Sequence, residues 1–227
     1  MPATPSLTRD EEVYVLDLGE DENRFHPDWI KAVEGLLDEV AAVEGPRALV
    51  TTATGKFFSN GLDIEWLGEH SEQATEYVHQ VHALFARVLA FPAPTVAALQ
   101  GHTFAAGAML ALAHDWRCMR ADRGFFCLPE ADINIPFTEG MTALIMSKLT
   151  PVAATDAMIT ARRYGGEDAL AAGLVDAVAE EDALLAAAVE RARPLAAKDG
   201  ATLGVIKQRM YAAEIEVLLD TSGSPFG

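Results

Sequence analysis

The sequence is poor in cations: 17 Lys and Arg stand against 34 Asp and Glu, which gives a formal net charge of −17. A strongly negative surface repels nucleic acid and anionic membranes, so we expect neither as a partner. No run of about 18 apolar residues occurs, so we expect no membrane-spanning helix. The first residues lack the apolar stretch of a signal peptide, and the last are not a peroxisomal address, so we expect a cytoplasmic protein.

Cysteine is also scarce, because only Cys118 and Cys127 are present. Two cysteines in apolar surroundings predict buried thiols rather than a disulfide framework. His79 and His82 share one face of an expected helix, but no further cluster completes a metal site, so we expect none. The chain also lacks the glycine-rich dinucleotide fingerprint, a complete P-loop and a G-x-S-x-G nucleophile elbow. These absences leave nucleotide-fold and serine-hydrolase functions without support.

Hydrophobic residues make up 50% of the chain, which is enough for a full core. Apolar patterns predict strands at 13–18, 48–53, 95–100, 116–119 and 124–128. They predict helices from Pro27 to before Pro46, at 71–91 and at 105–113. We expect residues 1–12 to be loose, 54–67 to form a loop and a short helix, 101–103 to be a turn, and the chain after 138 to be almost entirely helical. Strands that alternate with helices indicate an α/β fold with parallel strands.

Two junctions rich in small residues follow the second and third of these strands, at 58–63 and 101–109. A helix N-terminus leaves N–H groups unpaired, and Gly and Ala let a ligand approach the backbone closely. Two such junctions on neighbouring strands could each aim one N–H group at a single oxygen, which is the design of an oxyanion hole. The alternative is that Gly61 and Gly107 only permit tight turns and close packing.

The segments FFSNGLDI, GHTFAAGAMLALAHDWRCM, GFFCLPEADINIPF and GGEDALAAGLVDAV resemble the enoyl-CoA hydratase/isomerase (crotonase) superfamily, in order and spacing. The resemblance runs from about residue 13 to 215, and its motifs are most similar to those of plant-type Δ3,Δ2-enoyl-CoA isomerases. It implies a crotonase-type spiral of β-β-α units over 1–150. A helical trimerisation region follows over 151–227, and the assembly implied is a homotrimer or a dimer of trimers.

The resemblance also implies site residues. The oxyanion donors are the N–H groups of Leu62 and Ala106, and the substrate is an acyl-coenzyme A thioester, with no separate cofactor. Asp63 and Ile64 are expected near the adenine end of coenzyme A, with Lys56 and Arg24 as phosphate partners. Since coenzyme A is an anion and the chain is acidic, its site must be a local exception in charge. The full set of substrate-binding residues expected is Arg24, Lys56, Ser59, Gly61, Asp63, Ile64, Gly107 and Met109.

The resemblance also identifies the candidate acids. Hydratases of this family hold a water between two glutamates; here the first position is Met109, which cannot serve, and the second is Glu130. One carboxylate suffices to move a proton from C2 to C4 of a 3-enoyl thioester, and an apolar pocket would raise its pKa toward neutrality. Glu139 is a rival base. The residues expected to form the pocket around Glu130 are Phe125, Phe126, Leu128, Ile133, Ile135 and Phe137.

Several functions remain open at this point. The first is a Δ3,Δ2-enoyl-CoA isomerase of fatty-acid β-oxidation. The others are an enoyl-CoA hydratase with an unusual second acid, another reaction of the crotonase fold, and a catalytically silent relative that binds acyl-CoA. Because one fold hosts many chemistries, the fold alone does not decide between them.

Overall fold

The computed structural model of the chain describes residues 4–223. Within these residues, the strands are β1 (Ser6–Asp10), β2 (Val13–Asp17), β3 (Ala48–Thr52), β4 (Phe57–Ser59), β5 (Thr95–Leu99), β6 (His102–Phe104), β7 (Trp116–Arg120), β8 (Phe126–Cys127) and β9 (Ala177–Ala179).

The helices in the same part of the chain include two short 3-10 turns, η1 (Ser71–Gln73) and η2 (Arg193–Leu195). The α-helices are α1 (Pro27–Ala41), α2 (Ile64–Glu69), α3 (Ala74–Leu89), α4 (Ala106–Ala113), α5 (Glu130–Ile133), α6 (Glu139–Lys148), α7 (Pro151–Thr160), α8 (Gly166–Ala171), α9 (Leu184–Ala192), α10 (Gly200–Met210) and α11 (Ala212–Leu219).

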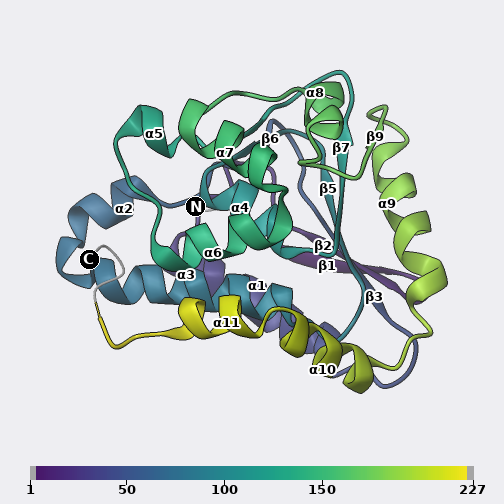
Figure 1. The fold of residues 1–227 in the computed structure, drawn as a ribbon. Coiled ribbons are helices and arrows are strands. Elements are labelled where there is room, and N and C mark those ends of the chain that lie inside the picture. Colours follow the sequence, from purple (N-terminus) through teal and green to yellow (C-terminus); the bar gives the residue numbers. More distant parts are fainter. Residues whose placement is uncertain (1–3, 224–227) are drawn as a thin grey trace.

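Two sheets organise the described residues. The larger has the order β1-β2-β3-β5-β7-β9, and the smaller has the order β4-β6-β8. Three successive units, β3-β4, β5-β6 and β7-β8, each place one strand in each sheet before a helix follows. This repetition is the predicted spiral of β-β-α units, and it makes the fold an α/β fold (Figure 1).

Both faces of the larger sheet are covered. Val15, Val50 and Val96 are paired neighbours in the register, and they pack on one side against α9. Leu16 and Leu49 lie on the other side, in the main core with α1, α3 and α4. Figure 1 shows α9 on one side of the sheet and these helices on the other. Continuous apolar strands, such as Ala48–Thr52, are the sequence signature of a sheet that is buried on both faces.

Several local predictions were wrong. Residues 6–10 form β1 and pair antiparallel with β2, although the segment 1–12 was expected to be loose; residues 1–3 lie outside the described part of the chain. The expected loop contains β4, and the expected turn overlaps β6; after residue 138 the described chain is almost entirely helical, as predicted, apart from the three-residue β9. The other strand pairs of both sheets are parallel, as predicted.

One further prediction is confirmed, that of buried thiols. Cys118 and Cys127 are buried free thiols. Among residues 4–223, no helix combines the length and the apolar character that crossing a bilayer requires.

Candidate active site

The two junctions predicted from the sequence meet in the folded chain. Strands β4 and β6 are parallel neighbours, with Phe57 opposite His102 and Ser59 opposite Thr103, so both end at the same edge of the small sheet. Gly61 lies so close to the second junction that a Cβ atom there would be 2.9 Å from the Ala106 N. Its φ of +83° is also one that side chains rarely adopt. Gly61 therefore permits both the tight turn and the close approach of the two junctions.

The N–H groups near this contact are almost all paired. Gly61 donates to the Ser59 Oγ at 3.1 Å, Asp63 donates to the Tyr77 hydroxyl at 2.9 Å, and Ala105 donates to the Cys127 carbonyl at 3.0 Å. Among residues 4–223, the N–H groups of Leu62 and Ala106 have no hydrogen-bond partner. Since unpaired N–H groups are costly unless a ligand or water satisfies them, these two are free to serve an external acceptor.

The backbone is strained at Ala105, immediately before α4. Its φ is 51° and its ψ is −127°, a conformation that glycine adopts much more readily than alanine. The strain is held in place by three hydrogen bonds: Ala105 donates to Cys127, and its carbonyl accepts from the N–H groups of Ala108 and Met109. The result is that α4 begins with its free N–H groups at the junction.

A cavity of about 260 Å³ opens at this junction. It brings together six of the predicted site residues, namely Arg24, Leu62, Ile64, Ala106, Met109 and Glu130. The other lining residues are Asn60, Phe104, Ala105, Pro129, Ile133, Ile135, Pro136 and Met141.

Glu130 is the acid of this cavity. It is the first residue of α5 and is 6% exposed. Burial raises the pKa of the Glu130 carboxyl to about 7, against a smaller opposing effect of its own backbone N–H. Its Oε2 atom is buried and has no hydrogen-bond partner among the described residues. A buried, unpaired carboxylate oxygen with a pKa near neutrality is suited to accept and return a proton.

The predicted apolar surroundings of Glu130 are only partly as expected. Ile133 and Ile135 line the cavity. Phe126 and Leu128 are instead fully buried in the main core, whereas Phe125 is exposed and Phe137 packs against the core from outside. These four positions do not line the cavity.

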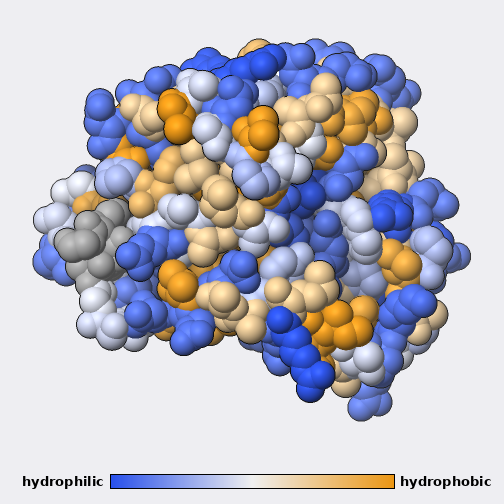
Figure 2. Space-filling model, in the orientation of Figure 1, coloured by the Kyte–Doolittle hydropathy of each residue, from blue (hydrophilic) through white to orange (hydrophobic). Residues whose placement is uncertain are grey.

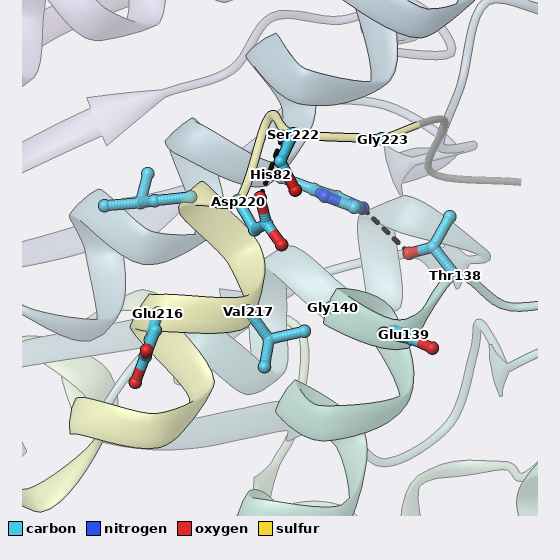
Figure 3. A pocket seen from close by; sticks show the side chains of 10 residues that line it. His82, Thr138, Glu139, Gly140, Glu216, Val217, Asp220, Ser222 and Gly223 are labelled. Carbon is cyan, nitrogen blue, oxygen red and sulfur yellow. Dashed lines mark hydrogen bonds between the residues drawn. The ribbon is translucent and has the colours of Figure 1, made fainter. Parts of the chain in front are cut away.

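The structure places Glu139 elsewhere. It is an exposed residue at the start of α6, beside a groove of about 790 Å³ that α11 and the segment 220–223 also line (Figure 3). In the same groove the buried His82 pairs with Thr138, at 2.8 Å between Nε2 and Oγ1. Burial lowers the pKa of His82 to about 4, so its ring is neutral. Glu139 does not line the cavity that holds Glu130.

Three further predicted residues support the loop rather than line the cavity. Ser59 is buried; its hydroxyl donates to the Asn23 carbonyl at 2.8 Å and accepts from Gly61. Asp63 caps α2 by accepting from the Trp66 N–H at 3.1 Å. Gly107 lies against β4, where a Cβ atom would be 2.6 Å from the Ser59 carbonyl oxygen.

The two predicted cations differ in their surroundings. Arg24 pairs with Glu22 at 2.6 Å and lies 3.9 Å from the carboxylates of both Asp63 and Glu65. Lys56 is exposed, with its Nζ 5.1 Å from the centre of the Phe57 ring. Arg24 is thus neutralised by acids, and Lys56 is not.

Sequence reasoning missed two bulky lining residues. Phe104 is the last residue of β6, directly before the strained Ala105, and its place in GHTFAAG was a usable signal. Met141 comes from α6, in the turn after Thr138, whose side chain accepts the Met141 N–H at 3.1 Å. Nothing in its local pattern indicates that α6 folds back over the junction.

The chain is similar to known proteins over nearly its whole length. The profile of the family described as "Enoyl-CoA hydratase/isomerase" matches residues 15–221. The chain belongs to this family. A relative from Arabidopsis thaliana, "Enoyl-CoA delta isomerase 3", is 37% identical over 217 residues, which is 91% of each chain. "Enoyl-CoA delta isomerase 2, peroxisomal", from the same plant, is 36% identical over 220 residues and also covers 91% of each chain.

Solved structures of the enoyl-CoA hydratase/isomerase family have the same fold. A family protein from Pseudomonas syringae superposes with a TM-score of 0.88 at 27% identity, over 95% of this chain and 93% of that one. An apo enoyl-CoA isomerase from Mycobacterium tuberculosis superposes with a TM-score of 0.86 at 27% identity, over 96% and 95% of the two chains. The family assignment therefore rests on sequence and fold together.

Proposed function

We propose that this family member is a Δ3,Δ2-enoyl-CoA isomerase that acts in fatty-acid metabolism. The single observation that carries the proposal is the cavity in which Glu130 lies with the unpaired N–H groups of Leu62 and Ala106. Relatives named enoyl-CoA delta isomerase, which match over nearly the whole chain, support the same reaction.

In the proposed mechanism, the thioester oxygen of a 3-enoyl-CoA accepts hydrogen bonds from the Leu62 and Ala106 N–H groups. The Glu130 carboxylate removes a proton from C2, and the electron pair moves into a dienolate whose negative charge lies largely on that oxygen. Protonated Glu130 then returns the proton at C4, so the double bond moves from C3–C4 to C2–C3. No water, metal or other reactant enters this balance.

Met109 favours isomerisation over hydration. It stands where hydratases of this family carry their first glutamate, it lines the cavity, and it is 1% exposed. A thioether cannot hold and split a water as a carboxylate does. Among residues 4–223, Glu130 is the one acid that lines the cavity, and one acid is sufficient for moving one proton along the acyl chain.

The other expected site residues take supporting roles in this proposal. Arg24 and Ile64 form part of the cavity wall. Ser59, Gly61 and Gly107 hold the two junctions together, and Asp63 fixes the start of α2.

The test is incubation of the protein with 3-hexenoyl-CoA, followed by the absorbance of the conjugated thioester. The wild type should form 2-hexenoyl-CoA from it and should not hydrate added 2-hexenoyl-CoA. Glu130→Gln should lose at least about 10³-fold in kcat while coenzyme A still binds, since only the proton carrier is removed. Glu139→Gln is the matched control, and loss in that variant alone would move the role to Glu139. Silence of the wild type toward both thioesters would favour a catalytically silent relative.

We also propose that the chain forms a homotrimer or a dimer of trimers. Large apolar side chains are exposed on α7 and α10, including Val152 (80%), Ile159 (72%) and Met210 (63%). Figure 2 shows apolar residues gathered on the face that carries α6, α7 and α10. Exposed apolar residues in such number favour a contact between copies. Sedimentation equilibrium tests this proposal, and a monomer at micromolar concentration would contradict it.

The cytoplasm is our proposed compartment. Cys118 and Cys127 are free thiols, as is usual for proteins of reducing compartments. Localisation of the full chain with a fluorescent tag tests this assignment, and a vesicular or organellar pattern would contradict it.

A further inference from the structure

The cavity of Glu130 has exposed walls at one end and buried walls at the other. Ile64 and Ile133 line it and are each 48% exposed, so they mark its mouth. Met109 and Met141 also line it and are 1% and 5% exposed, so they mark its closed end. Coenzyme A is too large and too polar for the closed end, which leaves that end to the acyl chain.

The volume of the cavity, about 260 Å³, limits how much of an acyl thioester it can hold. At roughly 30 Å³ for each non-hydrogen atom, which is the share of one water molecule in the liquid, the cavity holds about eight or nine such atoms. The sulfur, the carbonyl oxygen and an acyl chain of about six carbons account for that number. A longer chain therefore has to displace a wall of the cavity.

The wall at Met141 is the start of α6, and it is held in place from behind. The Met141 N–H group donates to the Thr138 side chain at 3.1 Å, and that side chain is hydrogen-bonded in turn to the buried His82 of α3 (Figure 3). Gly140 packs so closely that a Cβ atom there would lie 3.0 Å from Leu218 of α11 and 3.2 Å from His82. The α6 backbone therefore cannot retreat toward α3 and α11 to make room for a longer chain.

The side chain of Met141 is the part of this wall that a substitution can change. It is unbranched, and its Cγ, Sδ and Cε atoms occupy a space that would hold about three atoms of an acyl chain. Met109 lines the same closed end, but it lies on α4, one turn after the oxyanion candidate Ala106. A change at Met109 would therefore also disturb the binding of the thioester oxygen, whereas a change at Met141 alters the depth of the cavity alone.

We propose that Met141 sets the length of the acyl chain that this protein accepts, because its side chain closes the cavity after about six carbons. The inference rests on the proposed function and adds a substrate class to it, namely short-chain 3-enoyl-CoA thioesters. Up to that length, each methylene that finds apolar room should raise kcat/KM about fourfold, which is the effect of burying one methylene. Beyond that length, each methylene has to displace the Met141 side chain.

The test is a comparison of kcat/KM for 3-butenoyl-, 3-hexenoyl-, 3-octenoyl- and 3-decenoyl-CoA. For the wild type, kcat/KM should be highest at 3-hexenoyl-CoA and at least about tenfold lower at 3-decenoyl-CoA, since overfilling a packed site is unfavourable. Met141→Ala should move the maximum to a longer chain, and Met141→Phe should move it to 3-butenoyl-CoA. The matched control is Met146→Ala on the same helix; Met146 is 45% exposed and does not line the cavity, so this variant should keep the wild-type profile.

Calorimetric titration with hexanoyl-CoA and decanoyl-CoA gives a second readout that needs no turnover. The wild type should bind hexanoyl-CoA more tightly, and Met141→Ala should reverse this order. Equal binding of both thioesters by the wild type, or one chain-length profile shared by Met141→Ala and Met141→Phe, would overturn the inference and place the chain at the mouth, between Ile64 and Ile133.

The two readouts also separate this inference from the proposed function. A protein that isomerises 3-hexenoyl-CoA with a chain-length profile indifferent to Met141 contradicts this inference alone. A protein that binds saturated thioesters with the expected dependence on Met141, yet isomerises none of the 3-enoyl substrates, contradicts the proposed function alone. A protein that binds no acyl-CoA contradicts both.

Discussion

At the scale of single residues, the proposed mechanism depends on how burial changes the pKa of Glu130. A carboxylate with an ordinary pKa near 4.5 is a weaker base toward a C–H proton than one with a raised pKa, and burial raises the pKa of Glu130 to about 7. The apolar side chains around it, such as Ile133, Ile135 and Met141, therefore contribute to the chemistry without touching a proton.

The pH profile follows from this pKa. The base must be ionised, so kcat/KM for 3-hexenoyl-CoA should fall about tenfold for each pH unit below 7 and level off above it. Initial rates between pH 5 and 9 measure this profile. A rate that stays constant down to pH 5 would show that the base has an ordinary carboxyl pKa and is not Glu130.

Stability should change with pH in the opposite sense. Because the folded pKa of about 7 lies above the usual 4.5, the folded chain holds the Glu130 proton more tightly than the unfolded chain does. This contribution is complete below about pH 4.5 and is lost as the pH rises through 7. From pH 5 to pH 8, the free energy of unfolding of the wild type should therefore fall relative to Glu130→Gln by roughly 2–3 kcal/mol. Urea denaturation at both pH values measures the difference, and parallel changes in the two proteins would contradict it.

Some site residues were predictable from the sequence and others were not. Local pattern predicted the two small-residue junctions, and the family resemblance then implied Leu62, Ala106 and Glu130, which line one cavity in the structure. The sequence could not decide between Glu130 and Glu139, because the decision depends on the path of the segment between them. The wall formed by Met141 depends on the packing of α6, which no local pattern encodes.

At the scale of elements, the site depends on strands of two or three residues. Strands β4, β6 and β8 are too short for a period-2 pattern, which is why two of them were predicted as loop and turn. Their pairing nevertheless places both oxyanion candidates at one edge. Pairing across the sheet, rather than local propensity, thus creates these elements.

A substitution at Gly107 tests how closely α4 packs against β4. A Cβ atom there would lie 2.6 Å from the Ser59 carbonyl oxygen and 2.7 Å from the Ser59 Cβ, so Gly107→Ala must push α4 from β4. We expect a loss of about 1–3 kcal/mol in the free energy of unfolding, together with a loss of kcat. Gly35→Ala is the matched control, because Gly35 lies within α1 with open space around it, and it should gain about 0.5–1 kcal/mol. Denaturant unfolding measures both changes, and equal stability of the two variants would contradict the close packing.

The C-terminal helix α10 contacts the core through a partly buried ion pair that sequence reasoning did not find. Lys207 of α10 is 5% exposed, and its Nζ donates to the Asp115 carboxylate at 2.6 Å and to the Ala93 carbonyl at 2.7 Å. Asp115 and Lys207 are 92 residues apart, so no local pattern could pair them.

Removal of this cation should be costly. Lys207→Met leaves the Asp115 carboxylate without its closest partner, so we expect the free energy of unfolding to fall by about 3–5 kcal/mol. Lys198→Met, at an exposed position, should change it little. A loss below about 1 kcal/mol for Lys207→Met, measured by urea denaturation, would show that α10 is not held by this pair.

At the scale of the whole molecule, the fold class was predictable because its core is a buried parallel sheet with continuous apolar strands. Strands β1 and β9 were not among the predicted strands: every position of both is at least partly exposed, β1 is mostly polar, and β9 is only three residues long. Their places at the two ends of the larger sheet come from pairing with strands already formed. The division at residue 150 between core and trimerisation region stays a prediction.

The net charge of the molecule is strongly negative, whereas its expected ligand, coenzyme A, is an anion. A net charge of −17 indicates that an anionic thioester needs a local exception, and the sequence cannot show where scattered cations gather. In the folded chain, Lys56, Arg123 and Arg163 come from three different segments, and all three lower the pKa of His102. The local exception in charge that coenzyme A would need stays a prediction.

The most direct test of the central claim is a crystal structure of the protein with hexanoyl-CoA, a saturated thioester that binds without reacting. We predict that the thioester oxygen lies within about 2.7–3.2 Å of both the Leu62 N and the Ala106 N, as hydrogen bonds require. We also predict that a Glu130 carboxylate oxygen lies within reach of both C2 and C4. A thioester oxygen bound away from either N–H group, or a Glu130 carboxylate that faces away from the acyl chain, would contradict the account.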